Sequence, residues 1–253
     1  LHGLVRDKAG QKMSKSKGNV TNPMEIIQKY GADALRLSLC IGISPGNDLK
    51  IDEIKIQSFR NFVNKLWNIS RYILSQNSPL PPSLLKRGEG EFQPKTLADE
   101  WILYRLGETV SEVDEKLKKF DFGGAGEALL KFTWDDLADW YIEISKILSV
   151  PALPAGRRQA GKNLPRRSEK SNSQQILPHI LTKLLTLWHP FIPFVTEHIW
   201  SQFSKDFLMI QEYPKPEVVP LRGISRREKG RPPAERAGRS EAGQKFQTLR
   251  NLI

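Results

Sequence analysis

Two closely spaced lysines near the start of the chain are the residues best suited to chemistry. They lie in a five-residue run that also contributes two small hydroxyl groups: Lys12, Met13, Ser14, Lys15 and Ser16. Glycines stand on both sides, at Gly10 and Gly18, so the pattern predicts a flexible cationic loop. Because a lysine ammonium is a compact charge on a flexible stem, it can follow charge that develops on a leaving pyrophosphate. A solvated basic turn or a nucleic-acid patch has the same composition.

The exact string favours the first interpretation. Residues 12–16, followed by Gly18 and Asn19, resemble the second signature of the class I aminoacyl-tRNA synthetases. The resemblance implies that the loop closes over ATP and that Lys12 and Lys15 stabilise the transition state of adenylate formation, with all five residues of the run contacting ATP. The other class I signature, His-x-Gly-His, does not occur. We therefore expect an N-terminal catalytic half of the same protein that this chain lacks.

The positive charge is concentrated in two stretches. The net charge is +11, of which residues 152–175 contribute +5 and residues 221–243 contribute +4. Both stretches are rich in Gly, Pro, Ala and Arg, so they cannot bury enough apolar surface to form a core. We interpret them as insertions or linkers. They could add salt-sensitive affinity for a tRNA backbone, or they could be solvated segments without a specific role.

Composition also indicates which sites not to expect. The single cysteine, Cys40, excludes an internal disulfide and fits a reducing compartment. The four histidines show no metal-ligand spacing, and no apolar run approaches the length of a membrane span. We expect a cytoplasmic protein with no membrane association, no bound metal and no tightly bound cofactor.

Helical periodicity dominates the remainder of the chain. Asn22 is expected to cap a helix that Gly31 ends, with Glu25 completing a capping box. Further helices are predicted over these ranges: 33–41, 52–75, 96–120, 125–148, 176–188 and 194–203. Residues 207–210 are expected to be extended. Long helices joined by short loops predict a mainly α fold, an antiparallel helical bundle, whose core would contain six tryptophans: Trp67, Trp101, Trp134, Trp140, Trp188 and Trp200.

Two polar clusters on these helices could have a function. The helix over 52–75 carries a run of donors that could contact tRNA: Arg60, Asn61, Asn64, Lys65, Asn68 and Arg71. An ordinary solvated helix face has the same composition. The helix over 125–148 carries four carboxylates that could suggest a metal or acid–base site: Asp135, Asp136, Asp139 and Glu143. Salt bridges to neighbouring helices are the favoured interpretation.

A closer resemblance runs through most of the chain outside the two basic stretches. Five strings, in order and spacing, are similar to the valyl-tRNA synthetases: residues 2–7, 60–68, 97–103, 139–143 and 189–194. This resemblance implies ATP-dependent attachment of L-valine to a valine-accepting tRNA, with ATP and Mg²⁺ as co-substrates and an anticodon-binding bundle. Within this frame we divide the chain in three. Residues 1–45 end a Rossmann-type class I catalytic domain, 46–216 form the anticodon-binding bundle with a basic insertion at 152–175, and 217–253 are a basic linker and the start of a C-terminal helix.

Two alternatives stay open at this point. The protein could be a leucyl, isoleucyl or methionyl enzyme of the same class, because this chain contains no pocket that reads the amino acid. It could also be a stand-alone basic helical module that binds tRNA without catalysing a reaction.

Overall fold

The structure is a computed structural model, and it describes residues 3–7, 9–42, 46–76, 94–149 and 173–215. The basic stretch at 221–243, nearly all of that at 152–175, and the helix expected near the C-terminus lie outside the described residues.

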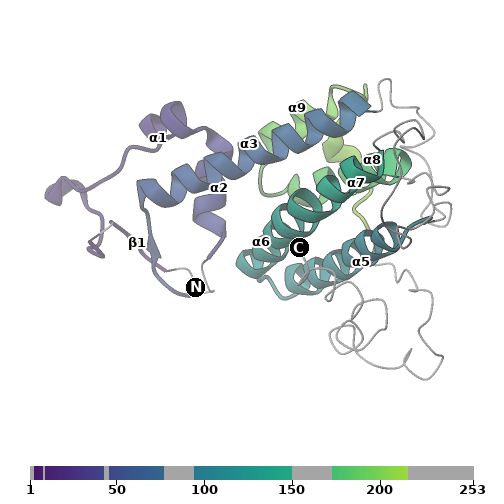
Figure 1. Cartoon of the computed structure of the whole chain (residues 1–253). Helices are drawn as coiled ribbons and strands as arrows, with labels where there is room; N and C mark the ends of the chain where they lie inside the picture. The colour runs from purple at the N-terminus through teal and green to yellow at the C-terminus, as the bar shows by residue number, and fades with distance from the viewer. Residues whose placement is uncertain (1–2, 8, 43–45, 77–93, 150–172, 216–253) are drawn as a thin grey trace, which may run out of the picture.

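The N-terminal part holds the lysine run between two short strands. β1 (Val5–Arg6) pairs in parallel with β2 (Leu49–Lys50), in the register Val5 with Leu49 and Arg6 with Lys50. Between them lie a 3₁₀ turn, η1 (Lys15–Lys17), and two helices, α1 (Pro23–Tyr30) and α2 (Ala32–Cys40). The strand pair closes this segment at its base, so the lysine run projects from a fixed point (Figure 1).

Local capping signals explain where α1 begins and ends. The Asn22 side chain accepts a hydrogen bond from the Met24 backbone N–H at 3.0 Å, and Pro23 occupies the first turn. Gly31 ends the helix with φ 92°, which a side chain would strain. Glu25 does not complete the expected capping box, because it accepts from the Asn22 side-chain amide at 3.0 Å and not from its backbone.

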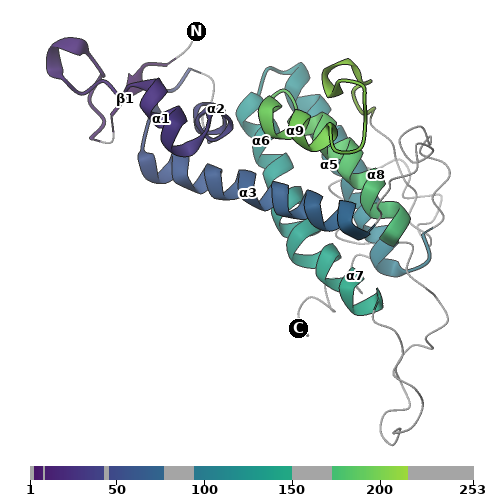
Figure 2. The same cartoon turned by 90° about the horizontal axis from the view of Figure 1, so that it is seen from above.

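A helical bundle forms most of the molecule. Its elements are α3 (Glu53–Gln76), α5 (Leu97–Lys118), α6 (Phe122–Lys131), the π-helical η3 (Phe132–Tyr141), α7 (Ile142–Ser149), α8 (Ser173–Trp188), α9 (Pro193–Trp200) and the 3₁₀ turn η4 (Leu208–Ile210). The long α3 runs from the N-terminal part along the bundle, as the view from above shows (Figure 2). The predicted mainly helical fold is therefore confirmed.

Two segments adopt a different secondary structure from the one predicted. The stretch 125–148 is not one α-helix: it starts at Phe122, which Asp121 caps, and it widens into a π-helix over Phe132–Tyr141 before returning to α. Residues 207–210 are not extended, since Leu208–Ile210 form a 3₁₀ turn that buries Leu208. Hydrophobic periodicity located both segments, but it does not distinguish α from π or 3₁₀ winding.

One contiguous apolar core joins α1 and α2 to the bundle. Only two of the six expected core tryptophans are buried in it, Trp188 and Trp200. Trp67, Trp101 and Trp134 are partly buried against its edge, and Trp140 is partly exposed outside the cluster. The Trp188 indole N–H donates to the Thr133 hydroxyl at 3.0 Å, which satisfies its polar atom inside the core. None of the helices in the part of the chain that the structure describes combines the length and apolarity that crossing a membrane requires.

Candidate functional site

The lysine run is anchored to β1 on one side. Arg6 and Lys12 form an antiparallel bridge, and the Met13 N–H donates to the Val5 carbonyl at 3.3 Å. The Arg6 guanidinium also binds the Gly10 carbonyl at 3.1 Å. Residues 6–13 therefore form a tight hairpin that delivers Lys12 and Met13 to the start of the loop.

Asn19 ties the two ends of the loop together. Its Oδ1 accepts from the Ser14 N–H at 2.9 Å, and its Nδ2 donates to the Asp7 carboxylate at 2.9 Å and to the Lys12 carbonyl at 3.3 Å. Asp7 also accepts from the Gln11 N–H at 2.8 Å. The hydrogen bond from Asn19, followed by that from Gln11, lowers the pKa of Asp7 below its ordinary value. We call the Asp7–Asn19 contact the loop clip.

The second lysine begins a single 3₁₀ turn. Lys15–Lys17 close through the Gly18 N–H, which donates to the Lys15 carbonyl at 3.2 Å, and Gly18 takes φ 66°. The Ser14 and Ser16 hydroxyls lie 3.1 Å apart. Lys12 and Lys15 are exposed, and no described residue forms a hydrogen bond or ion pair with either ammonium group. The loop thus presents two cations and two hydroxyls to solvent, a donor set that suits an oxyanion such as a polyphosphate.

Asp48 fixes the base of this loop from a distant position in the sequence. Its carboxylate pairs with the Arg6 guanidinium and accepts from the Leu4 N–H at 2.8 Å. The Leu4 hydrogen bond, followed by that from Arg6, lowers the pKa of Asp48. Sequence reasoning missed this role, because the only signal, an Asp in a turn cluster before β2, is shared by ordinary turns.

The polar face predicted on the helix over 52–75 is real and lies on α3. Five of its members are exposed (Arg60, Asn61, Asn64, Asn68 and Arg71), whereas Lys65 is half-buried. The Lys65 ammonium lies 2.6 Å from the Asp139 carboxylate and 4.0 Å from the centre of the Trp134 ring. A groove of about 480 Å³ follows this face between α3 and η3, lined by side chains that include Asn61, Asn64, Lys65, Asn68, Trp134 and Asp139.

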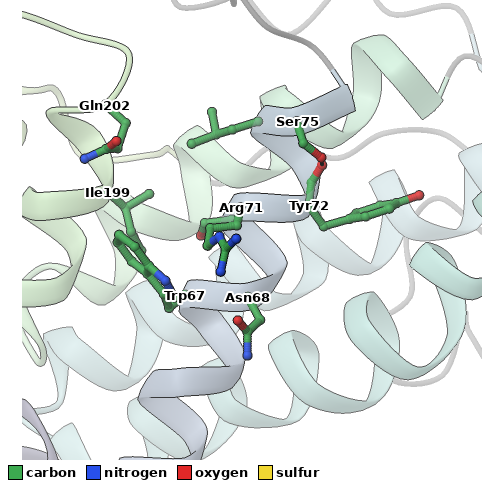
Figure 3. A pocket seen from close by; sticks show the side chains of 9 residues that line it. Trp67, Asn68, Arg71, Tyr72, Ser75, Ile199 and Gln202 are labelled. Atoms are coloured by element: carbon green, nitrogen blue, oxygen red, sulfur yellow. Dashed lines mark hydrogen bonds between the residues drawn. The ribbon is translucent and has the colours of Figure 1, made fainter.

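A second hollow, of about 490 Å³, lies on the other side of Asn68. Trp67, Asn68 and Arg71 line it from α3, while Ile199 and Gln202 line it from the end of α9 (Figure 3). The Trp67 ring stacks on His198 with centroids 5.3 Å apart and planes 14° from parallel. Trp67, His198 and Gln202 were not predicted as site residues, because nothing in the sequence reveals that α9 packs beside α3.

Two of the four carboxylates at 135–143, Asp136 and Asp139, form the expected salt bridges to neighbouring helices, Glu143 pairs within α7, and Asp135 is exposed. Asp136 accepts from Arg105 on α5 at 2.9 Å, Asp139 binds Lys65, and Glu143 binds Lys146 at 2.7 Å. Burial raises the pKa of Asp136, while the Arg105 charge opposes the rise.

Comparison with known proteins agrees with this geometry. The family described as the anticodon-binding domain of tRNA ligase matches residues 99–251, and the family described as tRNA synthetases class I (I, L, M and V) matches residues 1–52. Because the first match covers more than half of the chain, the chain belongs to the family of anticodon-binding domains of tRNA ligases, and its N-terminal residues match the class I synthetases.

Similar curated proteins include valine–tRNA ligases. That of Streptococcus thermophilus is 41% identical over 217 residues, covering 85% of this chain and 23% of the relative. That of Bacillus cereus is 45% identical over 207 residues, covering 81% of this chain and 22% of the relative. The chain therefore spans less than a quarter of the length of these relatives.

Two solved structures share the fold. The LeuRS of Agrobacterium radiobacter K84, solved as a LeuRS–tRNA–LeuAMS ternary complex, aligns with a TM-score of 0.64 at 21% identity, covering 85% of this chain and 23% of that one. The Mycobacterium tuberculosis methionyl-tRNA synthetase, solved with methionyl-adenylate, aligns with a TM-score of 0.52 at 20% identity, covering 78% of this chain and 36% of that one.

Proposed function

We propose that this chain supplies the lysine loop and the anticodon-binding bundle of a valine–tRNA ligase. The observation that carries the proposal is the pair of exposed lysines on a clipped loop, in a chain whose curated relatives are valine–tRNA ligases. The reaction would attach L-valine to its tRNA at the expense of ATP, in the cytoplasm.

In this proposal Lys12 and Lys15 are catalytic residues. The valine carboxylate attacks the α-phosphorus of ATP, the bond to the bridging oxygen breaks, and pyrophosphate leaves with the electron pair. Negative charge grows on the phosphate oxygens in the transition state, and two exposed ammonium groups can stabilise it more strongly there than in the ground state. Met13, Ser14 and Ser16 would contact the nucleotide, and Mg²⁺ would bind through the ATP phosphates.

The bundle would bind tRNA through α3. The exposed donors of this face are Arg60, Asn61, Asn64, Asn68 and Arg71. All but Arg60 line one of two hollows that each contain an indole ring, a combination suited to phosphates and unstacked bases. Lys65 would contribute less, because Asp139 already neutralises its charge. The proposed limits of the catalytic end (1–45), the bundle (46–216) and the C-terminal segment (217–253) complete this assignment.

The decisive experiment measures ATP–pyrophosphate exchange in the full-length ligase that carries this chain. Lys15→Ala should slow adenylate formation by roughly 100- to 1,000-fold, the usual loss for one preorganised transition-state donor. Binding of tRNA should change little. Lys17→Ala is the matched control, because Lys17 is exposed in the same turn but lies outside the five-residue run. Exchange near the parent rate in Lys15→Ala would remove the catalytic assignment.

Filter binding tests the tRNA face with the 253-residue chain itself. Arg71→Ala should weaken binding of valine tRNA and reduce the slope of its salt dependence by about one if Arg71 meets a phosphate. Lys118→Ala, which removes an exposed lysine of α5, is the control. Equal affinity for valine tRNA, an anticodon-altered version and an unrelated tRNA would leave only a basic surface. Preference for a leucine, isoleucine or methionine tRNA would support another enzyme of the class.

A further inference from the structure

Two side chains of α2, three residues apart, bind backbone groups of a turn more than 150 residues further along the chain. The Asp33 carboxylate accepts from the Val195 N–H at 2.7 Å and from the Phe194 N–H at 3.4 Å. Arg36 donates to the carbonyls of Phe191 and Pro190, each at 3.0 Å. Together, the two side chains bind backbone N–H groups and backbone carbonyls of the turn that leads into α9.

Asp33 replaces the missing cap of α9. The residue at the N-cap position is Ile192, which has no side-chain acceptor, and α9 begins with Pro193. The two N–H groups that Asp33 binds belong to the second and third residues of the helix, which an N-cap side chain normally serves. A carboxylate there also interacts favourably with the positive end of the helix dipole. The cap of α9 is thus supplied by α2.

This carboxylate occupies a position that disfavours its charge. Asp33 is only 6% exposed, and burial raises its pKa, although the Val195 and Phe194 hydrogen bonds oppose the rise. Burying a charge is costly unless it is hydrogen-bonded. An apolar residue with a separate cap on α9 would avoid that cost, but it would not bind the two helices together.

The other end of α2 is also fixed to the bundle. The Lys55 ammonium of α3 donates to the Ile41 carbonyl at 2.8 Å. Ile41 packs on α6 at Gly126, where an added Cβ would lie 2.7 Å from its side chain. α2 is therefore held at both ends and cannot tilt independently of α3, α6 and α9.

The helix that Asp33 caps also borders the hollow on α3. α9 contributes Ile199 to that hollow, and its His198 stacks on Trp67. In the opposite direction, α2 is separated from α1 by Gly31 alone, and α1 begins four residues after Asn19 of the loop clip. A short covalent path thus runs from the lysine loop to the helix beside the hollow.

From this arrangement we infer that Asp33 and Arg36 are positioning residues, which set the placement of the lysine loop relative to the tRNA-binding face. The inference rests on the proposed function. Neither side chain would touch ATP or tRNA. Their effect would appear when both regions must act on one substrate, in transfer of the amino acid to a tRNA bound by the bundle.

The test is carried out in the full-length ligase, well below the melting temperature of each variant. Arg36→Ala and Asp33→Ala should each lower kcat for tRNA charging by about tenfold, because small misplacements of reacting groups are costly. The Kd for tRNA and the KM for ATP should stay within about twofold of the parent. Arg36→Lys should restore part of the rate, since a single ammonium can replace one of the two hydrogen bonds. If Asp33→Ala does not fold, Arg36→Ala decides alone, because Arg36 is exposed.

Thr96→Ala is the matched control for a merely structural role. Thr96 caps α5 through Asp99 and, among the described residues, forms no hydrogen bond with α2 or α9, yet its removal also deletes a helix cap. It should lower the melting temperature to a similar extent while kcat stays near that of the parent. Equal kcat losses in Thr96→Ala and Arg36→Ala, or an unchanged kcat in Arg36→Ala, would overturn the inference. A parent enzyme that charges no tRNA would instead refute the proposed function.

Discussion

The lysine loop and the helical bundle hold their shapes by different means. Among the described residues from 3 to 20 none is buried, and the loop conformation depends on side-chain hydrogen bonds from Asp7, Asn19 and Asp48. The bundle instead closes around one apolar core that extends from α1 to η4. The loop can therefore change shape without disturbing the fold, whereas the surface presented by α3 is as stable as the core beneath it.

The largest expected effect is a difference in the free energy of unfolding between a substitution in the bundle and one in the loop. Leu184 is completely buried in α8, so Leu184→Ala should reduce the free energy of unfolding by about 2–5 kcal/mol through lost burial and a residual cavity. Lys12→Ala in the loop should change it by less than about 0.5 kcal/mol. Urea unfolding followed by circular dichroism measures both values. Similar losses from the two substitutions would contradict the contrast between the regions.

Leu39→Ala is a matched control for Leu184→Ala. Leu39 is 39% exposed on α2, so the same truncation should leave a smaller defect. A loss as large as that of Leu184→Ala would show that burial does not set the cost.

The second prediction concerns pH and the bundle alone. Burial lowers the pKa of His179 from 6.5 to about 4, because the interior disfavours the charged imidazolium. Below pH 6.5 the unfolded chain gains a proton at this position that the folded chain does not, so the free energy of unfolding falls as pH drops towards 4. The total loss should be about 3 kcal/mol. Above pH 6.5 the group contributes no pH dependence.

Measuring unfolding between pH 7 and 4 in His179→Gln isolates this contribution, because other groups titrate in the same range. The variant should show a shallower fall than the parent. Gln174→Ala, which alters an exposed residue of the same helix that carries no titratable group, should keep the parent slope. Parallel curves for the parent and His179→Gln would exclude a buried neutral histidine as the cause.

These predictions depend on features that the sequence revealed to different degrees. Asn22, Gly31 and Thr96 marked helix ends correctly, because capping is decided by a few adjacent residues. The lysine run was equally readable as a contiguous string. The β1–β2 pair, the Asp33 cap of α9 and the capture of Lys65 by Asp139 were not readable, since each joins residues more than 40 positions apart.

For the candidate site, too, the sequence revealed local features but not contacts between distant residues. Sequence indicated which residues of the loop and of α3 have the right chemistry. It did not indicate that Asn19 orients the loop, that Trp67 and α9 complete a hollow beside Asn68, or that Lys65 already has a partner. Donor-rich helix faces look alike in sequence, and only packing against other helices decides which side chains stay available.

The smallest expected effect on stability refines the comparison within the loop. Asn19→Ala removes the loop clip, so cleavage by trypsin after Lys12, Lys15 and Lys17 should speed up several-fold as the turn opens more often. The free energy of unfolding of the bundle should stay within about 0.5 kcal/mol of the parent. Asn61→Ala, an exposed asparagine on α3, is the control and should leave cleavage unchanged. Unaltered cleavage in Asn19→Ala would mean that the clip does not hold the loop.

The π-helical stretch over Phe132–Tyr141 sets the rotational phase of the helix that follows it. In this wider winding each residue turns by less than the roughly 100° of an α-helix, so the same ten residues wound as an α-helix would leave α7 rotated relative to α3. Lys146, now 5.3 Å from the centre of the Tyr72 ring on α3, would turn away, and a different side of α7 would border the groove. The winding of one helix thus decides which side chains border the groove between α3 and η3.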